Sequence, residues 1–214
     1  MVLGRLRNAV NPLKHALAAP FIAFQVHPNT VSLLGIPLAV IAAYFIAVPH
    51  WGLALVFLVL TPIPDFVDGT VARSLNLRSN WGNYLQTVID RVIELILFAG
   101  FSVHYSFASV LALGFGALSS YAKARVGLVI VTDNRDWPAM GENADKKVLL
   151  MLGVALSLFV PRVAGVNVIE GALYVAALIS FTGTVQRMLY AKKLIKEAEQ
   201  KGHVLPYIKE GKER

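Results

Sequence analysis

The sequence lacks cysteine and is poor in charged residues. Asp, Glu, Lys and Arg together make up 15% of the 214 residues, whereas 56% are hydrophobic. Without cysteine no disulfide framework is possible, and cysteine usage leaves the redox compartment open. The apolar fraction exceeds the roughly 45–50% of soluble domains. The length suits one membrane domain of about six helices, each of ~20 residues.

Acidic residues are scarce, and three of them lie within or at the edge of apolar segments: Asp65, Asp68 and Asp90. A charge at membrane depth is costly, so such residues indicate a functional site. Asp65 and Asp68 are three residues apart, and Gln86 and Asp90 are four apart, so on helices each pair shares one face. Two such faces turned toward each other would gather three carboxylates and one amide, a set of oxygen ligands suited to a hard divalent cation.

Polar turns divide the rest of the chain into apolar segments. We predict an all-α integral membrane protein with an N-terminal amphipathic helix lying in the membrane interface. The six expected spans are 30–48, 51–73, 81–105, 107–126, 147–160 and 168–189. Pro62 and Pro64 should loosen the second span just before Asp65. The expected domains are an interfacial helix (1–26), a six-helix membrane domain (27–195) and a basic tail (196–214).

Positive charge is distributed unevenly about these spans. With six crossings both termini lie on one side, and 18 of the 20 Lys and Arg residues lie on that side or at its span ends. By the positive-inside rule this side is the cytoplasm. We therefore expect a multi-pass protein of the cell membrane with its termini and active site facing the cytoplasm. The net charge of +7 then reflects topology and contact with anionic lipid rather than nucleic-acid binding.

The stretch from Asp65 to Asp90 reads D-x2-D-G-x2-A-R-x8-G-x3-Q-x3-D. It resembles the signature of the CDP-alcohol phosphotransferase family, D-x2-D-G-x2-A-R-x8-G-x3-D-x3-D. Seven of the eight fixed residues are present, and the exception is Gln86, where the family has its third aspartate.

The resemblance implies a fold, a reaction and a set of site residues. Members of the family bind a CDP-lipid and a polar alcohol, transfer the lipid phosphate to the alcohol, release CMP and often form homodimers. Asp90 would be the catalytic base, and Mg²⁺ or Mn²⁺ would bind Asp65, Asp68, Gln86 and Asp90. The residues implied to contact the CDP-lipid are Asn29, Thr30, Val31, Ser32, Gly69, Ala72, Arg73 and Ser79.

Within the family, the chain is most similar to the phosphatidylinositol-phosphate synthases and their archaeal, archaetidylinositol-phosphate relatives. That similarity rests on the ends of the fourth and sixth spans and the start of the fifth. It implies that Arg125, Lys146 and Arg187 form a cationic pocket for a phosphorylated acceptor such as inositol phosphate. Asn143 and Lys146 stand where those enzymes usually carry arginine, and lysine lacks the bidentate fork of arginine.

Gln86 leaves alternatives open. The enzyme could work with one cation or a weakly held second one, Glu94 could compensate, or the chain could bind a CDP-lipid without turnover. Glycerol phosphate or serine could replace inositol phosphate as the acceptor. A membrane prenyltransferase would usually need two aspartate-rich motifs, whereas this chain has one. An ion-coupled transporter would be expected to show an inverted repeat, and none is evident in the sequence. We interpret Arg91 and Glu94 as a structural pair, because residues three apart on a helix satisfy each other.

Overall fold

Long apolar helices dominate the computed structural model, which describes residues 2–130, 137, 140 and 143–203. Within this part of the chain, four helical segments are long and apolar enough to cross a membrane. They are Pro28–Ala47, Trp51–Ser74, Asn80–Val126 and Val168–Gln200. The prediction of an all-α membrane protein is thus confirmed at this level.

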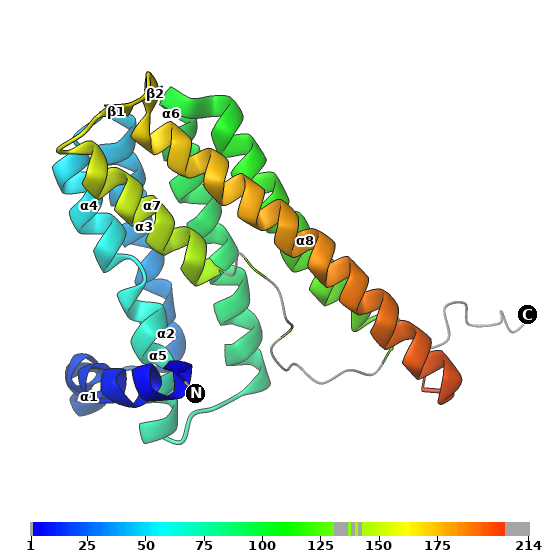
Figure 1. Cartoon of the computed structure of the whole chain (residues 1–214). Coiled ribbons are helices and arrows are strands. Elements are labelled where there is room, and N and C mark those ends of the chain that lie inside the picture. Colours follow the sequence, from blue (N-terminus) through cyan, green and yellow to red (C-terminus); the bar gives the residue numbers. More distant parts are fainter. Residues whose placement is uncertain (1, 131–136, 138–139, 141–142, 204–214) are drawn as a thin grey trace, which may run out of the picture. The chain divides into compact units, whose positions relative to one another are not determined.

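Figure 1 shows the order of the elements. The helices are α1 (Val2–Ala23), α2 (Pro28–Leu33), α3 (Gly35–Ala47), α4 (Trp51–Leu60), α5 (Ile63–Ser74), α6 (Asn80–Val126), α7 (Asn143–Ser157) and α8 (Val168–Gln200). Two short strands, β1 (Arg162–Val163) and β2 (Val166–Asn167), pair antiparallel between α7 and α8. The chain divides into two units, Met1–His104 and Tyr105–Arg214.

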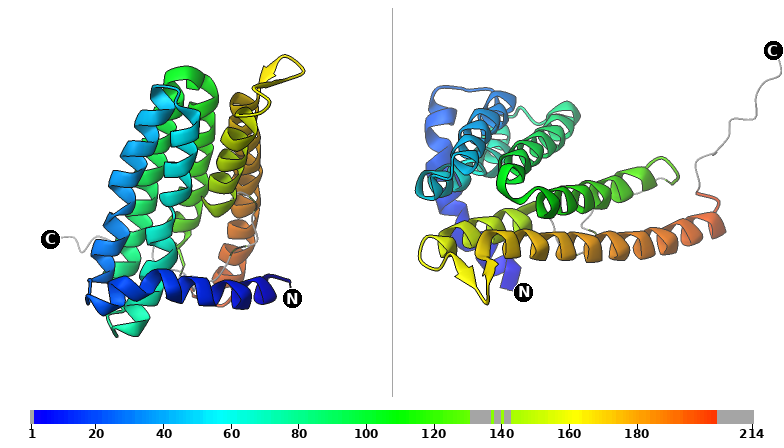
Figure 2. Two further views of the ribbon diagram at one scale, coloured as in Figure 1. Left: turned by 90° about the vertical axis from the view of Figure 1, so that its left-hand side faces the viewer. Right: turned by 90° about the horizontal axis from the view of Figure 1, so that it is seen from above.

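In the first unit, α1 lies across one end of the other helices rather than alongside them (Figure 2). A buried cluster of Ala18, Val31, Val67 and Val71 joins α1 to α2 and α5. The ammonium of Lys14 also lies 4.3 Å from the centroid of the Phe66 ring, a cation–π contact between α1 and α5. The expected N-terminal helix is present, and the crosswise arrangement fits its predicted place in the membrane interface.

Close approach of α3 to the first part of α6 depends on glycine. A Cβ added at Gly100 would lie 2.8 Å from the Cα and carbonyl oxygen of Ala43. One added at Gly35 would lie 2.6 Å from Cδ1 of Ile93. Small residues at such crossings let helix backbones pack closely where membrane helices lack a hydrophobic force to join them.

The second apolar segment breaks where the prolines predict. Helix α4 ends at Leu60, Thr61 and Pro62 form a turn, and α5 restarts at Ile63 with Pro64 in its first turn. The hydroxyl of Thr61 donates to the carbonyl oxygen of Phe57 at 2.7 Å, so this polar side chain is satisfied within its own helix. The break places Asp65 and Asp68 on a separate short helix.

In the second unit, α7 packs against α8. A Cβ at Gly153 would lie only 2.6 Å from Cβ of Ala172, so the two helices are in close contact there. The rings of Phe115 and Phe181 meet edge to face with centroids 5.1 Å apart, which joins α8 to the C-terminal part of α6.

The predicted six crossings remain a prediction. Helix α6 has 47 residues, or about 70 Å, more than twice the ~30 Å hydrocarbon core. It is kinked at Tyr105, where the sequence predicts the third span to end. Helix α7 has 15 residues, or about 22 Å, shorter than one full crossing. Helix α8 continues past the predicted domain boundary at 195 to Gln200, and the short hairpin is not predicted from the sequence.

Candidate active site

A cavity of about 550 Å³ lies between α2, α5 and the start of α6 in the first unit. This size is within the range of pockets that hold small ligands. Its lining is polar for a membrane protein and includes carboxylate, guanidinium, amide and hydroxyl groups. The described residues that line it come from three short stretches, 28–32, 68–73 and 77–86, so the lining includes Asp68 but neither Asp65 nor Asp90.

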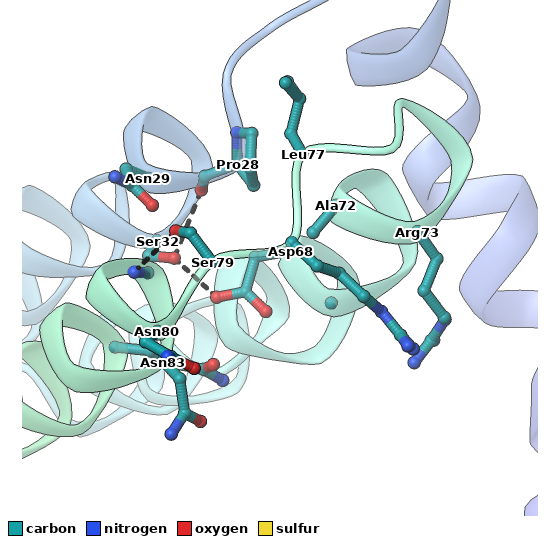
Figure 3. A pocket seen from close by; sticks show the side chains of 14 residues that line it. Pro28, Asn29, Ser32, Asp68, Ala72, Arg73, Leu77, Ser79, Asn80 and Asn83 are labelled. Carbon is teal, nitrogen blue, oxygen red and sulfur yellow. Dashed lines mark hydrogen bonds between the residues drawn. The ribbon is translucent and has the colours of Figure 1, made fainter.

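Asp68 is the most deeply buried acid of the motif, with 4% of its surface exposed. Its Oδ2 accepts a hydrogen bond of 2.5 Å from the Ser32 hydroxyl, across the cavity from α2 (Figure 3). Its other oxygen, Oδ1, is buried and has no hydrogen-bond partner. A buried carboxylate oxygen without a donor is costly, so this atom calls for a proton, a water or a cation.

Asp65 and Asp90 lie close enough to Asp68 for their charges to act on it. Asp65 and Asp90 are not among the described residues that line the cavity, so the predicted gathering of three carboxylates around one point stays a prediction. The amide Nε2 of Gln86 donates to Oδ1 of Asp65 at 2.6 Å. Gln86 thus meets the acidic cluster, but through its nitrogen rather than through the oxygen expected of a metal ligand.

Two glycines keep room around these groups. A Cβ at Gly69 would meet only Nη1 of Arg73, at 4.0 Å, so Gly69 leaves space inside the cavity wall. A Cβ at Gly82 would lie 3.2 Å from both Oδ1 of Asn29 and Oγ of Ser79. The Gly82 amide donates to that Ser79 hydroxyl at 3.0 Å. Gly82 therefore permits the approach of α2 to the N-terminal end of α6.

The residues expected to contact a CDP-lipid divide into two groups. Those lining the cavity are Asn29, Ser32, Gly69, Ala72, Arg73 and Ser79. The Val31 side chain instead belongs to the apolar core, and Thr30 is exposed outside the lining. The helical turn at Pro28–Leu33 explains the difference, because neighbouring helix positions point to different faces.

Arg73 lines the cavity and donates through Nη2 to the Thr70 hydroxyl at 3.0 Å. Arg78, Asn80 and Asn83 also line it, although the sequence analysis assigned them no role. Arg78 is exposed and lies in the short loop between α5 and α6. The sequence signal for Arg78 was a cation in the short polar loop inside the motif, between Arg73 and Gly82.

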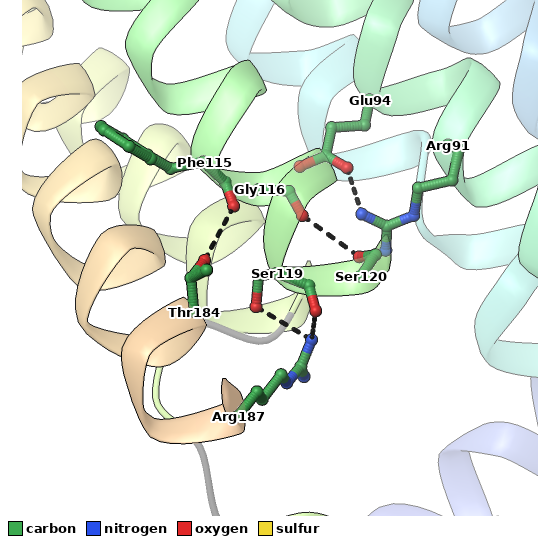
Figure 4. A network of polar contacts seen from close by, with 8 residues as sticks. All are labelled: Arg91, Glu94, Phe115, Gly116, Ser119, Ser120, Thr184 and Arg187. Atoms are coloured by element: carbon green, nitrogen blue, oxygen red, sulfur yellow. Dashed lines mark hydrogen bonds and ion pairs between the residues drawn. The ribbon is translucent and has the colours of Figure 1, made fainter. Parts of the chain in front are cut away.

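Arg91 and Glu94 form an ion pair on α6, as the sequence predicts (Figure 4). Glu94 is buried, with 7% of its side chain exposed. Because Arg91 already balances its charge, Glu94 is a poor substitute for the carboxylate that position 86 lacks.

The three cations predicted for the acceptor differ in their surroundings. Arg187 is 8% exposed and donates through Nη1 to both the carbonyl and hydroxyl oxygens of Ser119, each at 3.0 Å (Figure 4). Lys146, near the start of α7, is 4% exposed. Arg125 is exposed at the end of α6. Asn143 begins α7, and its side chain is outside the described residues.

The acidic groups fit a cation only in part. Among the described residues, no group of three or more His, Asp or Glu side chains is arranged to hold a metal ion by itself. The orphaned Oδ1 of Asp68 is nevertheless a hard anionic ligand, with Asp65 and Asp90 nearby. Asp68 thus offers one oxygen ligand for a divalent cation, and a bound phosphate would supply further ones.

Two solved structures share this fold. The crystal structure of Mycobacterium tuberculosis phosphatidylinositol phosphate synthase in complex with manganese and citrate superposes with a TM-score of 0.71 at 20% identity, over 84% of this chain and 88% of that one. The same enzyme with CDP-DAG bound gives a TM-score of 0.71 at 19% identity, over 84% and 94% of the two chains.

Curated relatives are similar over most of their length. A phosphatidylinositol phosphate synthase of Streptomyces avermitilis is 30% identical over 202 residues, covering 84% of this chain and 80% of the relative. An archaetidylinositol phosphate synthase of Pyrococcus horikoshii is 22% identical over 198 residues, covering 90% and 97%. The sequence pattern of the CDP-alcohol phosphatidyltransferases matches residues 25–185, which is more than half of the chain. The resemblance inferred from the motif is confirmed, and the chain belongs to the CDP-alcohol phosphatidyltransferase family.

Proposed function

We propose that this protein transfers a phosphatidyl-type group from a CDP-lipid to a polar alcohol, with inositol phosphate as the acceptor, and releases CMP. The observation that carries the proposal is the cavity around Asp68, whose buried Oδ1 has no partner and whose Oδ2 is held by Ser32. The family as a whole is divalent-metal dependent. A diphosphate bearing a nucleoside has the size and charge for this cavity.

In this proposal the chain's own residues bind and orient the diphosphate. Arg73 and Arg78 offer guanidinium forks to phosphate oxygens at the cavity wall. Ser32 holds the Asp68 carboxylate in one orientation, and Gly69 leaves the space that a phosphate would fill. The Asp68 carboxylate, whose Oδ1 has no hydrogen-bond partner, would hold a divalent cation, which would supply neutralising charge to the diphosphate and the leaving CMP.

The transfer forms one bond and breaks another. The acceptor hydroxyl oxygen attacks the lipid-side phosphorus, and the bond from that phosphorus to the bridging oxygen breaks, so that CMP leaves with the bridging oxygen. Asp90 takes the proton of the acceptor hydroxyl as a general base. The position of Asp90 as the last carboxylate of the family motif supports this role.

Inositol phosphate as the acceptor is supported by two observations. The relatives from Streptomyces avermitilis and Pyrococcus horikoshii are named for inositol phosphate products. In the second unit, Arg187 and Lys146 are buried cations, and guanidinium and ammonium groups are the side chains that bind phosphate. We extend the proposal to the cell membrane with a cytoplasm-facing site, because 18 of the 20 Lys and Arg residues lie on one predicted side. The proposed homodimer rests on the family resemblance.

A second candidate is a CDP-lipid binder without turnover, favoured by the loss of one motif carboxylate at Gln86. CMP release by the purified protein distinguishes the two. CDP-diacylglycerol and CDP-archaeol are each supplied with Mg²⁺ or Mn²⁺ and with inositol phosphate, glycerol phosphate, serine or free inositol. Release that requires inositol phosphate supports the proposal. Binding of the CDP-lipid without release under any condition supports the second candidate.

A further inference from the structure

The contact between Gln86 and Asp65 is the feature that separates this site from the family signature. Gln86 Nε2 lies 2.6 Å from Asp65 Oδ1. The two residues are 21 positions apart in sequence and lie on different helices, α6 and α5. Both side chains are half-buried. An amide facing a carboxylate must present its N–H, because two oxygens at that distance would repel each other. The chemistry of the pair therefore fixes the orientation of the amide.

This contact changes what holds Asp65. In the family signature, positions 65 and 86 are both aspartates, and two carboxylates at this distance would need a cation or a shared proton between them. Here a neutral donor satisfies one oxygen of Asp65 directly. The place where a cation would bridge the two positions is taken by a hydrogen bond, and the cluster carries one negative charge fewer.

Asp68 has the opposite character. Its Oδ1 is buried without a partner, although Ser32 satisfies Oδ2, and the charges of Asp65 and Asp90 act on it. The two sides of the acidic cluster are thus unequal. On one side an amide satisfies Asp65, and on the other the Asp68 carboxylate, which lines the cavity, keeps a buried oxygen without a partner.

We propose that this protein holds one divalent cation at Asp68, and that the Gln86 amide takes the place of a second cation by holding Asp65. The inference rests on the proposed function, because it concerns the cation that serves the same diphosphate site. Gln86 is then a positioning residue, and the lost carboxylate is compensated by a hydrogen bond rather than by another acid. The pairing of Glu94 with Arg91 is consistent with this, since Glu94 is already neutralised.

The test counts ions in the full-length protein purified in detergent. The protein is stripped with a chelator, titrated with Mn²⁺ and freed of excess by gel filtration, after which bound manganese per chain is measured by mass spectrometry. Electron paramagnetic resonance separates an isolated Mn²⁺ from a coupled pair, because two ions about 3.5–4 Å apart interact magnetically. We expect one manganese per chain and the spectrum of an isolated ion.

Two variants make the test specific to position 86. Gln86→Asp should raise the count to two per chain and give a coupled spectrum. Asn83→Asp adds the same charge to the wall of the same cavity, one helical turn earlier, and should leave the count at one. Two ions in the native chain, one ion in folded Gln86→Asp, or two in Asn83→Asp would each overturn the inference. The native count stands even if a variant fails to fold.

The ion count and the proposed function fail in different ways. CMP release from a native chain that holds two manganese ions would overturn the single-ion inference and leave the transferase function standing. One tightly held manganese with no CMP release from any CDP-lipid and acceptor would overturn the function, while the count would still be as inferred.

Discussion

The hydrogen bond from Ser32 to Asp68 offers a sharp test of how the cavity is organised. The Ser32 hydroxyl has one proton and two acceptors within reach, Asp68 Oδ2 at 2.5 Å and the carbonyl oxygen of Pro28 at 3.2 Å. The shorter, charge-assisted contact takes the proton. In a Ser32→Ala variant, Asp68 loses the donor on Oδ2 while Oδ1 already lacks one, so the carboxylate is no longer fixed toward the cavity.

A hydrogen bond to a charged group contributes about 1.5–3 kcal/mol. If that free energy orients Asp68 for cation and diphosphate, its loss corresponds to about a 10- to 150-fold fall in kcat/KM for the CDP-lipid. We expect Mn²⁺ affinity to fall with it, since the same oxygen pair is involved. The assay is CMP release with saturating acceptor, together with Mn²⁺ titration of the same preparation.

The matched control is Thr87→Ala. The Thr87 hydroxyl is exposed and donates only within its own helix, to the carbonyl oxygen of Asn83 at 3.0 Å. Its removal should change kcat/KM by less than about twofold. Native kcat/KM and Mn²⁺ affinity in a folded Ser32→Ala protein would refute the assigned role of Ser32.

Three further changes test separate parts of the structure. Gly100→Ala should lower the free energy of unfolding in detergent by about 1–3 kcal/mol, because its Cβ would lie 2.8 Å from the Ala43 backbone. Gly114→Ala, where the Cβ has open space, should be neutral or stabilising. Equal melting temperatures for the Gly100→Ala and native proteins would contradict the close helix contact. Arg78→Gln should raise KM for the CDP-lipid about three- to tenfold, an effect moderated by solvent, while Arg162→Gln on the exposed hairpin should not. Arg187→Gln should raise KM for inositol phosphate about tenfold or more with CDP-lipid binding unchanged, and a change in CDP-lipid binding instead would remove Arg187 from the acceptor site.

Local chemistry in the sequence predicted much of the fold. Pro62 and Pro64 mark the break between α4 and α5, because proline lacks the N–H that a continuing helix needs. The expected end of a span at Tyr105 coincides with the kink in α6. The three-residue spacing of Arg91 and Glu94 predicts their ion pair, because residues three apart on a helix lie on the same face.

The sequence alone could not predict which side chains of different helices point toward each other. Asn29 and Ser32 line the cavity while Val31 is in the core, and this depends on how α2 is rotated against α5. The Gln86–Asp65 contact joins two helices, so the motif spacing alone left open whether Gln86 is a ligand or a donor. Arg78 was missed because it occupies no fixed position of the motif.

The central claim is that the cavity around Asp68 binds a CDP-lipid and passes its phosphatidyl-type group to an alcohol. Its most direct test is CMP release with Mn²⁺ and inositol phosphate by the native protein, by the chelated protein and by Asp68→Asn, with CDP-lipid retention measured in parallel. We predict release only from the native protein with the cation present, and recovery on adding Mn²⁺ back to the chelated sample. Equal release from Asp68→Asn, or no release from native protein that retains the CDP-lipid and the cation, would contradict the account.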